Sequence, residues 1–529
     1  MPQASRVPLL AVAAVLPLYG VWALFLATGG GDLAAQYAWA GFFTRHPGAP
    51  YGLFWFGGAH IANYSVLSPP LMAVLGVRTV SVLAGVSATW LLARLLERTV
   101  PRVAVWPALV AALGLWYNVA LGRTTFALGL ALGLAGLLAV AGRPPRPSRL
   151  TAAALGALLA TLGSPVAGLF LLVAGAGYLL DRQYGKFLAL AVPPIAVVAC
   201  TTLLFPFQGE QPMAASRMVL PVLLSAAVAG AAPREWRVVR AGAVVYAVGV
   251  VLCWLIPSPI GSNVERLAVH LAPAALLAAA LHRRSTAIRK GIRRSRSRGV
   301  ALLVAVLSVF HLCLTSLGNL RGPDPVPAWA SHADGVFAAL DRLGADRTRV
   351  EMPTDVDHRG ATLLGPHVPL MRGWNQQLDV ERGRLFYDGS LDGPRYHAWL
   401  RHWAVGYVVV HTGTPERSAV GETDLIVAGQ DWLEPVWHDR YWKIYRVRDA
   451  RPLVSAPAHV RHGGEADLSL WMPRAGTVTV RIAYSPWLRA EGACVRANGP
   501  WTEVTVRCAG EYRLTSGYAT GRSAESGCG

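Results

Sequence analysis

The sequence predicts a polytopic α-helical membrane domain of about 11 transmembrane helices, followed by an extracytoplasmic α/β module and a β-sandwich. Composition is the first reason: of 529 residues, 53% are hydrophobic and 15% are charged, whereas about 25% are charged in soluble domains. Charge segregation is the second. Residues 1–318 hold 6 of the 30 acidic side chains but 25 of the 49 basic ones, so the net charge of +19 belongs to the apolar part. This excludes a disordered chain, a fibre and a single soluble domain, and it argues against a nucleic-acid-binding surface.

The membrane domain is predicted from apolar windows of about 15–20 residues, the length that crosses a ~30 Å hydrocarbon layer as a helix. This domain covers residues 1–318. Its windows are 8–27, 78–95, 103–118, 124–141, 150–163, 165–181, 187–205, 218–232, 240–256, 266–281 and 300–318.

The loops predict the topology. Every even-numbered connection is basic, and the tenth, residues 282–298, contains eight arginines or lysines. Twenty basic residues lie on that side of the membrane and five on the other. By the positive-inside rule, the protein is a multi-pass plasma-membrane protein with a cytoplasmic N-terminus and an extracytoplasmic C-terminal domain. The first window is expected to span the membrane, because no small-residue cleavage site follows it.

The extracytoplasmic part divides into an α/β module, residues 319–455, and a β-rich module, residues 456–529. In the first module, periodicity predicts helices and short strands at 332–343, 349–352, 396–403, 405–411 and 434–448. In the second, strict alternation with Gly and Pro turns predicts a β-sandwich with strands at 468–471, 477–481 and 502–506.

Cysteines and short motifs limit the cofactors. Cys494 and Cys508 flank a predicted hairpin in an oxidising compartment, which favours a disulfide between them. The sequence has no CxxC, no HExxH, no Walker loop and no GxGxxG after a strand. It therefore gives no sign of a structural zinc site or of a cytoplasmic nucleotide site.

Three of the six acids of the membrane domain, Asp32, Glu210 and Glu265, fall on the predicted outer face. Distant carboxylates and arginines on one face suit an anionic lipid-linked substrate, because arginine binds phosphate and a carboxylate can take a proton. Further polar residues at this level are Gln36, His46, His60, Tyr64, Asn118, Arg123, Gln208, Gln211, Arg217, Asn263, Arg266 and His270.

Asp32 is the sharpest of these candidates, because it follows Gly29–Gly31 and begins a segment with helical spacing. Simpler roles stay open. Asp32 could be only a helix N-cap, and the arginines could be snorkelling to headgroups. Glu210 and Glu265 could pair with Arg217 and Arg266, and His46 and His60 could be ordinary interfacial residues.

At these residues the chain resembles the GT-C superfamily of integral-membrane glycosyltransferases, which use polyprenyl-phosphate sugars. The likeness rests on the helix order, on the Gly30-Gly-Asp32 loop, and on the outer turns 118–123 and 261–266. It implies that Asp32 is the catalytic base. Many members carry a DxD-like pair of acids, but Ala34 stands at the second position here. Whether the protein needs Mg²⁺ or Mn²⁺, with Asp32 as a ligand, therefore stays open. The outer domain resembles those of actinobacterial envelope arabinosyl- and mannosyltransferases.

The resemblance implies sugar transfer from a polyprenyl-phosphate donor to a cell-envelope glycan or glycolipid at the outer membrane face, as in cell-wall biogenesis. Arg123, Arg266 and Arg217 would bind the donor phosphate. The residues expected to contact substrate are Gln36, His60, Tyr64, Asn118, Glu210, Asn263 and Glu265. Two other classes stay open: a transporter or flippase of lipid-linked glycans, and a non-catalytic envelope-assembly protein with a sugar-binding outer domain.

Overall fold

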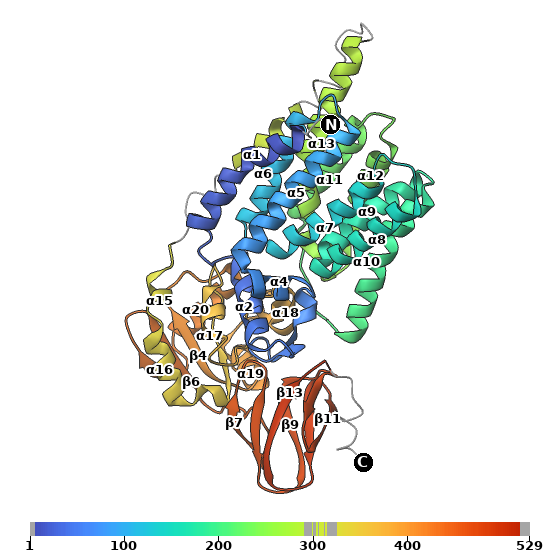
Figure 1. The fold of residues 1–529 in the computed structure, drawn as a ribbon. Coiled ribbons are helices and arrows are strands. Elements are labelled where there is room, and N and C mark those ends of the chain that lie inside the picture. The colour runs from blue at the N-terminus through green and yellow to red at the C-terminus, as the bar shows by residue number, and fades with distance from the viewer. Residues whose placement is uncertain are drawn as a thin grey trace. The chain divides into compact units, whose positions relative to one another are not determined.

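The computed structural model describes residues 6–289, 299, 303–304, 306–310, 313–314 and 325–518. The chain forms two compact units (Figure 1). Unit 1 comprises Met1–Thr28, Ser65–Leu204 and Glu210–Pro323, and unit 2 comprises Gly29–Tyr64, Phe205–Gly209 and Asp324–Gly529. The first outer loop, which the sequence places in the membrane domain, therefore folds as part of the same unit as the C-terminal modules.

Unit 1 is helical. Neighbouring helices pack in sequence order, α7 on α8, α9 on α10, and α11 on α12. The helices of this unit are α1 (Arg6–Val21), its π-helical continuation η1 (Trp22–Leu26), α4 (Ser68–Leu75), α5 (Val77–Thr99), α6 (Val105–Ala120), α7 (Thr124–Val140), α8 (Pro147–Gly163), α9 (Pro165–Leu180), α10 (Tyr184–Leu204), α11 (Ala215–Ala231), α12 (Arg237–Leu255), η2 (Gly261–Glu265) and α13 (Arg266–Arg289).

Ten of the expected windows coincide with helices of unit 1. Five helices in the described part of the chain are long and apolar enough to cross a membrane: Arg6–Leu26, Val77–Thr99, Tyr184–Leu204, Arg237–Leu255 and Gly261–His282. Several shorter helices, α6, α7, α9 and α11, are also apolar. The eleventh window, 300–318, lies largely outside the described residues, so the total of 11 crossings stays a prediction.

Small residues let α7 and α8 approach closely. A Cβ on Gly136 would lie 2.9 Å from the carbonyl oxygen of Ala153, and one on Gly129 would lie 2.8 Å from that of Ala160. Glycine and alanine at such positions let two helix backbones come into van der Waals contact, which is how helices associate where lipid removes the hydrophobic driving force.

The α/β module of unit 2 contains a four-stranded sheet of order β3-β4-β6-β5. Strand β3 (Arg349–Glu351) is parallel to β4 (Val405–His411), and the hairpin of β5 (Leu433–His438) and β6 (Trp442–Val447) pairs antiparallel with β4. The other elements are α2 (Asp32–Arg45), β1 (Tyr51–Gly52), β2 (Ala59–His60), α3 (Ile61–Tyr64), α15 (Ala328–Ser331), α16 (Asp334–Leu343), η3 (Ala345–Arg347), α17 (Arg359–Leu364), α18 (Gln376–Arg382), η4 (Arg384–Phe386), α19 (Gly393–His402), η5 (Arg417–Ala419) and α20 (Val420–Val427). The helices and strands expected in this module are confirmed.

Helix α2 belongs to the core of this module. Its buried residues Trp39 and Phe42 lie in one apolar cluster with Val336 of α16, Val409 of β4 and Ile444 of β6. The side chains of Phe42, Val336, Val409 and Ile444 are fully buried. Helix α2 is therefore fixed by the sheet, and its first residue, Asp32, is fixed with it.

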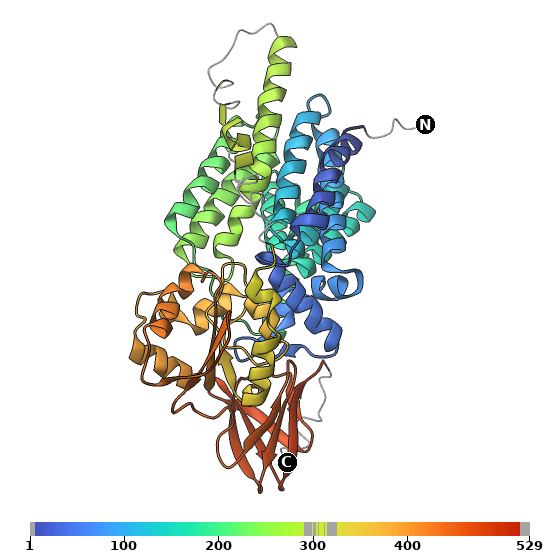
Figure 2. The same cartoon turned by 90° about the vertical axis from the view of Figure 1, so that its left-hand side faces the viewer.

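The β-rich module is a sandwich of two antiparallel sheets, of order β10-β13-β8-β7 and β11-β12-β9, drawn in red in Figure 2. Alternate residues such as Leu470, Val480, Val504 and Leu514 are fully buried between the sheets, which confirms the expected alternation. Its strands are β7 (His459–Gly463), β8 (Leu468–Met472), β9 (Gly476–Ala483), β10 (Leu488–Ala490), β11 (Ala493–Asn498), β12 (Trp501–Val506) and β13 (Gly510–Ser516).

The expected disulfide between Cys494 and Cys508 is wrong. Cys494 is disulfide-bonded, but Cys508 is a free, exposed thiol, so the partner of Cys494 lies outside the described residues. In the β11–β12 ladder Cys494 faces Thr505. Cys508 lies past the end of β12, where its sulfur is 3.3 Å from the hydroxyl of Tyr512. The two cysteines flank the hairpin in sequence, but the register does not place them opposite each other.

Candidate functional site

The glycine run before Asp32 makes a tight turn in unit 2. Gly29 and Gly31 have φ of 94° and 61°, which glycine adopts without strain. Gly31 occupies the cap position of α2, and Asp32 is the first helical residue. The interpretation of Asp32 as a simple N-cap is therefore not supported, since the cap position belongs to its neighbour.

This turn lies against the segment that follows β3. The backbone N–H of Gly31 donates a hydrogen bond of 2.7 Å to the carbonyl of Asp357. A Cβ on Gly30 would lie 2.9 Å from Nη2 of Arg359 and 3.0 Å from Cβ of Asp357. A side chain at position 30 would therefore crowd Asp357 and force the Arg359 guanidinium to shift.

A pair of carboxyl groups, Asp355 and Asp357, lies in this segment. The Asp355 carboxylate accepts hydrogen bonds from the backbone N–H groups of Arg359, at 3.0 Å, and Gly360, at 3.2 Å. Nε2 of His411 is 3.8 Å from the Asp355 carboxylate. Asp357 accepts a hydrogen bond of 2.5 Å from Nε of Arg359. Two carboxyls, a guanidinium and an imidazole thus lie beside the turn that carries Asp32.

The environment separates the acidities of the two aspartates. Burial raises the pKa of Asp357 to about 7, and the hydrogen-bonded, negatively charged Asp355 acts in the same direction, against the opposing effect of Arg359. Burial would also raise the pKa of Asp355, but the nearby His411 imidazole, 3.8 Å away, and a hydrogen bond with the Asp357 carboxyl hold it below its ordinary value. The pair therefore holds one proton up to about neutral pH, as groups that exchange protons with a substrate do.

Asp357 also makes the stability of unit 2 depend on pH. Because its folded pKa of about 7 exceeds the unfolded value of 3.8, the folded state binds more protons between these values and loses stability as pH rises through them. When the pH is raised from 5 to 8, we expect the Tm of the Asp357→Asn variant to fall less than the Tm of the wild-type protein. Differential scanning fluorimetry at fixed ionic strength measures the two slopes, and equal slopes would contradict the assignment.

Sequence reasoning missed this pair, because it searched the acids of the apolar half only. A signal was present: Asp355-Val-Asp-His-Arg359 places two acids, a histidine and an arginine within five residues, directly after a short buried strand. What no pattern could supply is the contact between this segment and Gly29–Gly31, which lie more than 300 positions earlier.

The other residues expected near Asp32 have varied surroundings. Gln36, one turn along α2, is buried, and its Oε1 has no hydrogen-bond partner among the described residues. His60 is buried with Nε2 2.9 Å from the Ser485 hydroxyl, and burial lowers its pKa to about 4. Tyr64 stacks on Trp39 at 5.9 Å. His46 lies 3.2 Å from Glu465. These contacts of His60, Tyr64 and His46 join parts of unit 2, and a substrate role for His60 and Tyr64 stays a prediction.

In unit 1, the three expected phosphate ligands stand at the N-terminal ends of three helices. Arg123 precedes α7, Arg217 is in the first turn of α11, and Arg266 is the first residue of α13. Their charges all act on the carboxylate of Glu265, and Nε of Arg217 is 3.3 Å from its Oε1. Residues that are far apart in the sequence therefore form one group, the arginine cluster, around Glu265.

Contacts within the arginine cluster order the guanidinium groups. Arg266 donates a hydrogen bond of 2.6 Å to Oδ1 of Asn263 and lies 5.4 Å from the ring centre of Phe126. Three cationic side chains act on one carboxylate, and helix N-termini add partial positive charge from their backbone N–H groups. Of the pairings that the sequence left open, the ion pair between Arg217 and Glu265 is present, and three guanidinium groups gathered around one site suit an anionic ligand.

Buried polar groups lie near the arginine cluster in unit 1. Asn118 donates a hydrogen bond of 3.4 Å to the carbonyl of Arg123, and its Oδ1 has no partner among the described residues. His270, one turn after Arg266, is buried beside Tyr117, and neither ring nitrogen has a hydrogen-bond partner in the described part of the chain. Gln211, next to Glu210, donates a hydrogen bond of 3.2 Å to Ser262. Unmade hydrogen bonds of this kind suit a polar ligand.

A metal centre does not fit the described residues, because none of them form a group of three or more His, Cys, Asp or Glu side chains placed to hold an ion. Asp32 has an acidic neighbour segment, but Ala34 replaces the second acid of a DxD pattern.

Comparison with known proteins gives three kinds of result. A domain of unknown function (DUF8823) matches residues 455–500, and no curated protein matches the chain. The oligosaccharyltransferase of Archaeoglobus fulgidus, tethered to an acceptor peptide containing the NVT sequon, is similar with a TM-score of 0.46 and 11% identity, over 77% of this chain and 69% of that chain.

ArnT from Cupriavidus metallidurans bound to undecaprenyl phosphate is similar with a TM-score of 0.42 and 15% identity, over 84% of this chain and 98% of that chain. Its apo state has a TM-score of 0.39 and 16% identity, over 82% and 97%. Since all three TM-scores are below 0.5 and the matched domain is short, what the chain does is inferred from its own residues.

Proposed function

We propose that this protein is a GT-C-type membrane glycosyltransferase that moves a sugar from a polyprenyl-phosphate donor to a cell-envelope glycan or glycolipid at the outer face of the plasma membrane. The observation that carries the proposal is the arginine cluster: Arg123, Arg217 and Arg266, each at the N-terminal end of an apolar helix, act on one carboxylate. Guanidinium groups and helix N-termini are the groups that bind phosphate esters most strongly. Apolar helices beside them suit a polyprenyl chain.

The proposed reaction needs a base and a stabilised leaving group. The hydroxyl oxygen of the acceptor forms a bond with the anomeric carbon as the bond from that carbon to the phosphate oxygen breaks. Asp32 takes the hydroxyl proton, and the arginine cluster stabilises the negative charge on the departing polyprenyl phosphate. The Asp355–Asp357 pair, which holds a proton near neutral pH, stands beside the Asp32 turn and can relay that proton to solvent. The sugar is proposed to be arabinofuranose or mannose.

Donor binding tests the arginine cluster directly. We expect the double substitution Arg123→Gln and Arg266→Gln to weaken binding of polyprenyl phosphate about 10²–10⁴-fold, because each of the two lost charge-assisted hydrogen bonds contributes about 1.5–3 kcal/mol and each 1.4 kcal/mol is tenfold. The measurement is microscale thermophoresis of the detergent-purified chain with a short-chain polyprenyl phosphate. Arg78→Gln is the matched control, since Arg78 is a unit 1 arginine on the predicted outer side that bonds the carbonyl of Ala27 at 2.7 Å. Unchanged affinity in the double variant would remove the cluster from the donor site.

The reaction itself separates this proposal from the other classes. Purified protein in proteoliposomes, given a radiolabelled polyprenyl-phosphate sugar and an envelope acceptor, should form labelled glycan and free polyprenyl phosphate. A flippase would move the intact donor across the bilayer without cleaving it. A non-catalytic assembly protein would neither cleave nor move it.

A further inference from the structure

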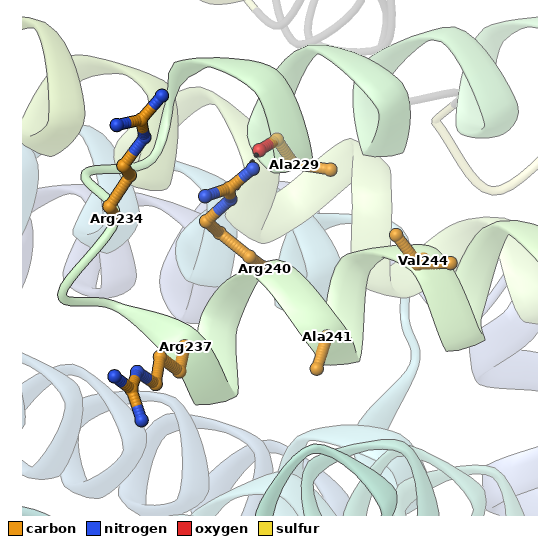
Figure 3. A pocket seen from close by; sticks show the side chains of 6 residues that line it. All are labelled: Ala229, Arg234, Arg237, Arg240, Ala241 and Val244. Carbon is orange, nitrogen blue, oxygen red and sulfur yellow. Dashed lines mark hydrogen bonds between the residues drawn. The ribbon is translucent and has the colours of Figure 1, made fainter. Parts of the chain in front are cut away.

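A cavity lined by arginines lies in unit 1 at the opposite end of α11 from Arg217, where α11 ends and α12 begins. It has a volume of about 300 Å³, comparable with small ligand sites. Because Arg217 lies 14 residues before Ala231, the last residue of α11, about 21 Å of helix separates this end from the arginine cluster. Figure 3 shows its lining side chains, which are Ala229, Arg234, Arg237, Arg240, Ala241 and Val244.

Three arginines and no acid line this cavity. Nε of Arg240 donates a hydrogen bond of 3.1 Å to the carbonyl of Ala229, which ties the side chain of α12 to the end of α11. Arg237 has only a long contact, 3.9 Å, with Asp181, and its side chain is 78% exposed. Arg234 is exposed as well. The cavity therefore presents clustered, largely solvated positive charge.

The floor of the cavity continues into an apolar strip. Val244, Val248 and Leu252 follow at intervals of four along α12, so they share one face of the helix, and they are 54%, 54% and 48% exposed. On α11, Leu223 is 60% exposed. A soluble phosphate would contact only the arginines. A lipid would place its phosphate on the arginines and an acyl chain along the strip.

We propose that this cavity binds the headgroup of an anionic glycerophospholipid of the cytoplasmic leaflet, with its phosphodiester on Arg234, Arg237 and Arg240. The sequence places this connection on the cytoplasmic side by the positive-inside rule. Basic pockets between helices on that side recognise lipid phosphates through charge and bidentate hydrogen bonds. The site is independent of sugar transfer, because it lies at the other end of α11.

Lipid retention tests the site in the full chain. We expect detergent-purified protein to retain cardiolipin or phosphatidylglycerol, but not phosphatidylcholine, in native mass spectrometry after lipid titration. Arg234→Gln, Arg237→Gln and Arg240→Gln together should weaken retention at least about tenfold, given about fivefold per arginine near a charged surface. The matched control removes three arginines from another basic connection, Arg143→Gln, Arg146→Gln and Arg149→Gln, and should retain lipid as wild type does.

Each other outcome overturns the proposal. If both triple variants lost lipid equally, the lipid would be held by general attraction to positive charge. If the Arg234, Arg237 and Arg240 variant retained as much lipid as the wild-type protein, the site would be excluded. Displacement of cardiolipin by millimolar inorganic phosphate would make the ligand a free phosphate rather than a lipid. Should the triple variant fail to fold, Arg234→Gln alone serves, because Arg234 is exposed, and we expect it to weaken retention a few-fold.

Discussion

Asp32→Asn should lower the rate of sugar transfer about 10²–10⁴-fold, the range that a general base contributes. Asparagine has the shape of aspartate but cannot take the proton of an attacking hydroxyl. Because Asp32 is the first residue of α2, and α2 is fixed in the core by Trp39 and Phe42, the substitution leaves the backbone in place. Expression, Tm and donor affinity should therefore stay close to wild type. The measurement is single-turnover transfer from a radiolabelled polyprenyl-phosphate sugar.

The matched control is Asp334→Asn. Asp334 is also the first residue of a helix of unit 2, α16, but it is exposed and away from the Asp355–Asp357 segment in sequence and contact. It reports the cost of removing an acid from a helix N-terminus, about 0.3–1 kcal/mol of stability. We expect its transfer rate to be unchanged. A normal rate for Asp32→Asn would exclude Asp32 as the base, and an equal loss in both variants would indicate a stability effect.

Arg372→Met should destabilise unit 2 by about 3–5 kcal/mol, the cost of leaving buried charges without their partner. Arg372 is 1% exposed. It makes two hydrogen bonds of 2.7 Å with Asp379 and one of 2.7 Å with Glu422. Glu351, also fully buried, lies in the same group, and burial together with the Glu422 charge raises its pKa. Methionine would fill the volume but leave three acids facing one another.

Urea unfolding followed by tryptophan fluorescence measures this loss. The carboxyl groups left in the variant can be protonated, so its deficit should be larger at pH 8 than at pH 5. Arg395→Met is the control, because the pair of Arg395 with Asp392 is 3.5 Å long and exposed, and such pairs contribute about 0–1 kcal/mol. A deficit below about 1 kcal/mol for Arg372→Met would mean that the buried group is not held together by its charges.

The parts of the fold that the sequence predicts correctly are those with a local period. Apolar windows place the helices of unit 1, and the alternation around Leu470 and Val480 places the sandwich. Long-range contacts have no such signal. The packing of α2 in the sheet core, the hydrogen bond from Gly31 to Asp357, and the register that sets Cys494 against Thr505 depend on tertiary structure that no window of the sequence contains.

The candidate site divides in the same way. The odd-numbered loops predict one set of residues on the outer face, namely Arg123, Arg217, Asn263, Glu265 and Arg266. Within unit 1 these residues are neighbours. The role of the arginines as donor ligands stays a prediction. Odd- and even-numbered loops are predicted on opposite sides of the membrane, so the number of a loop indicates which residues share a side. Helix ends on the same side can then lie close together. The loop number cannot find Asp355 and Asp357, which reach the Asp32 turn through the folding of a module that begins after the last membrane crossing.

The shared core of α2, β4 and β6 has a consequence for biosynthesis. The ribosome makes Asp32 early, yet Trp39 and Phe42 of the same helix can pack on Val409 and Ile444 only after some 400 further residues have been made. A nascent or truncated polypeptide that lacks the C-terminal modules thus inserts its helices without ordering the carboxylate at position 32. For the proposed transferase, completion of translation is in this way a condition for activity, and a fragment left by premature termination would not transfer sugar.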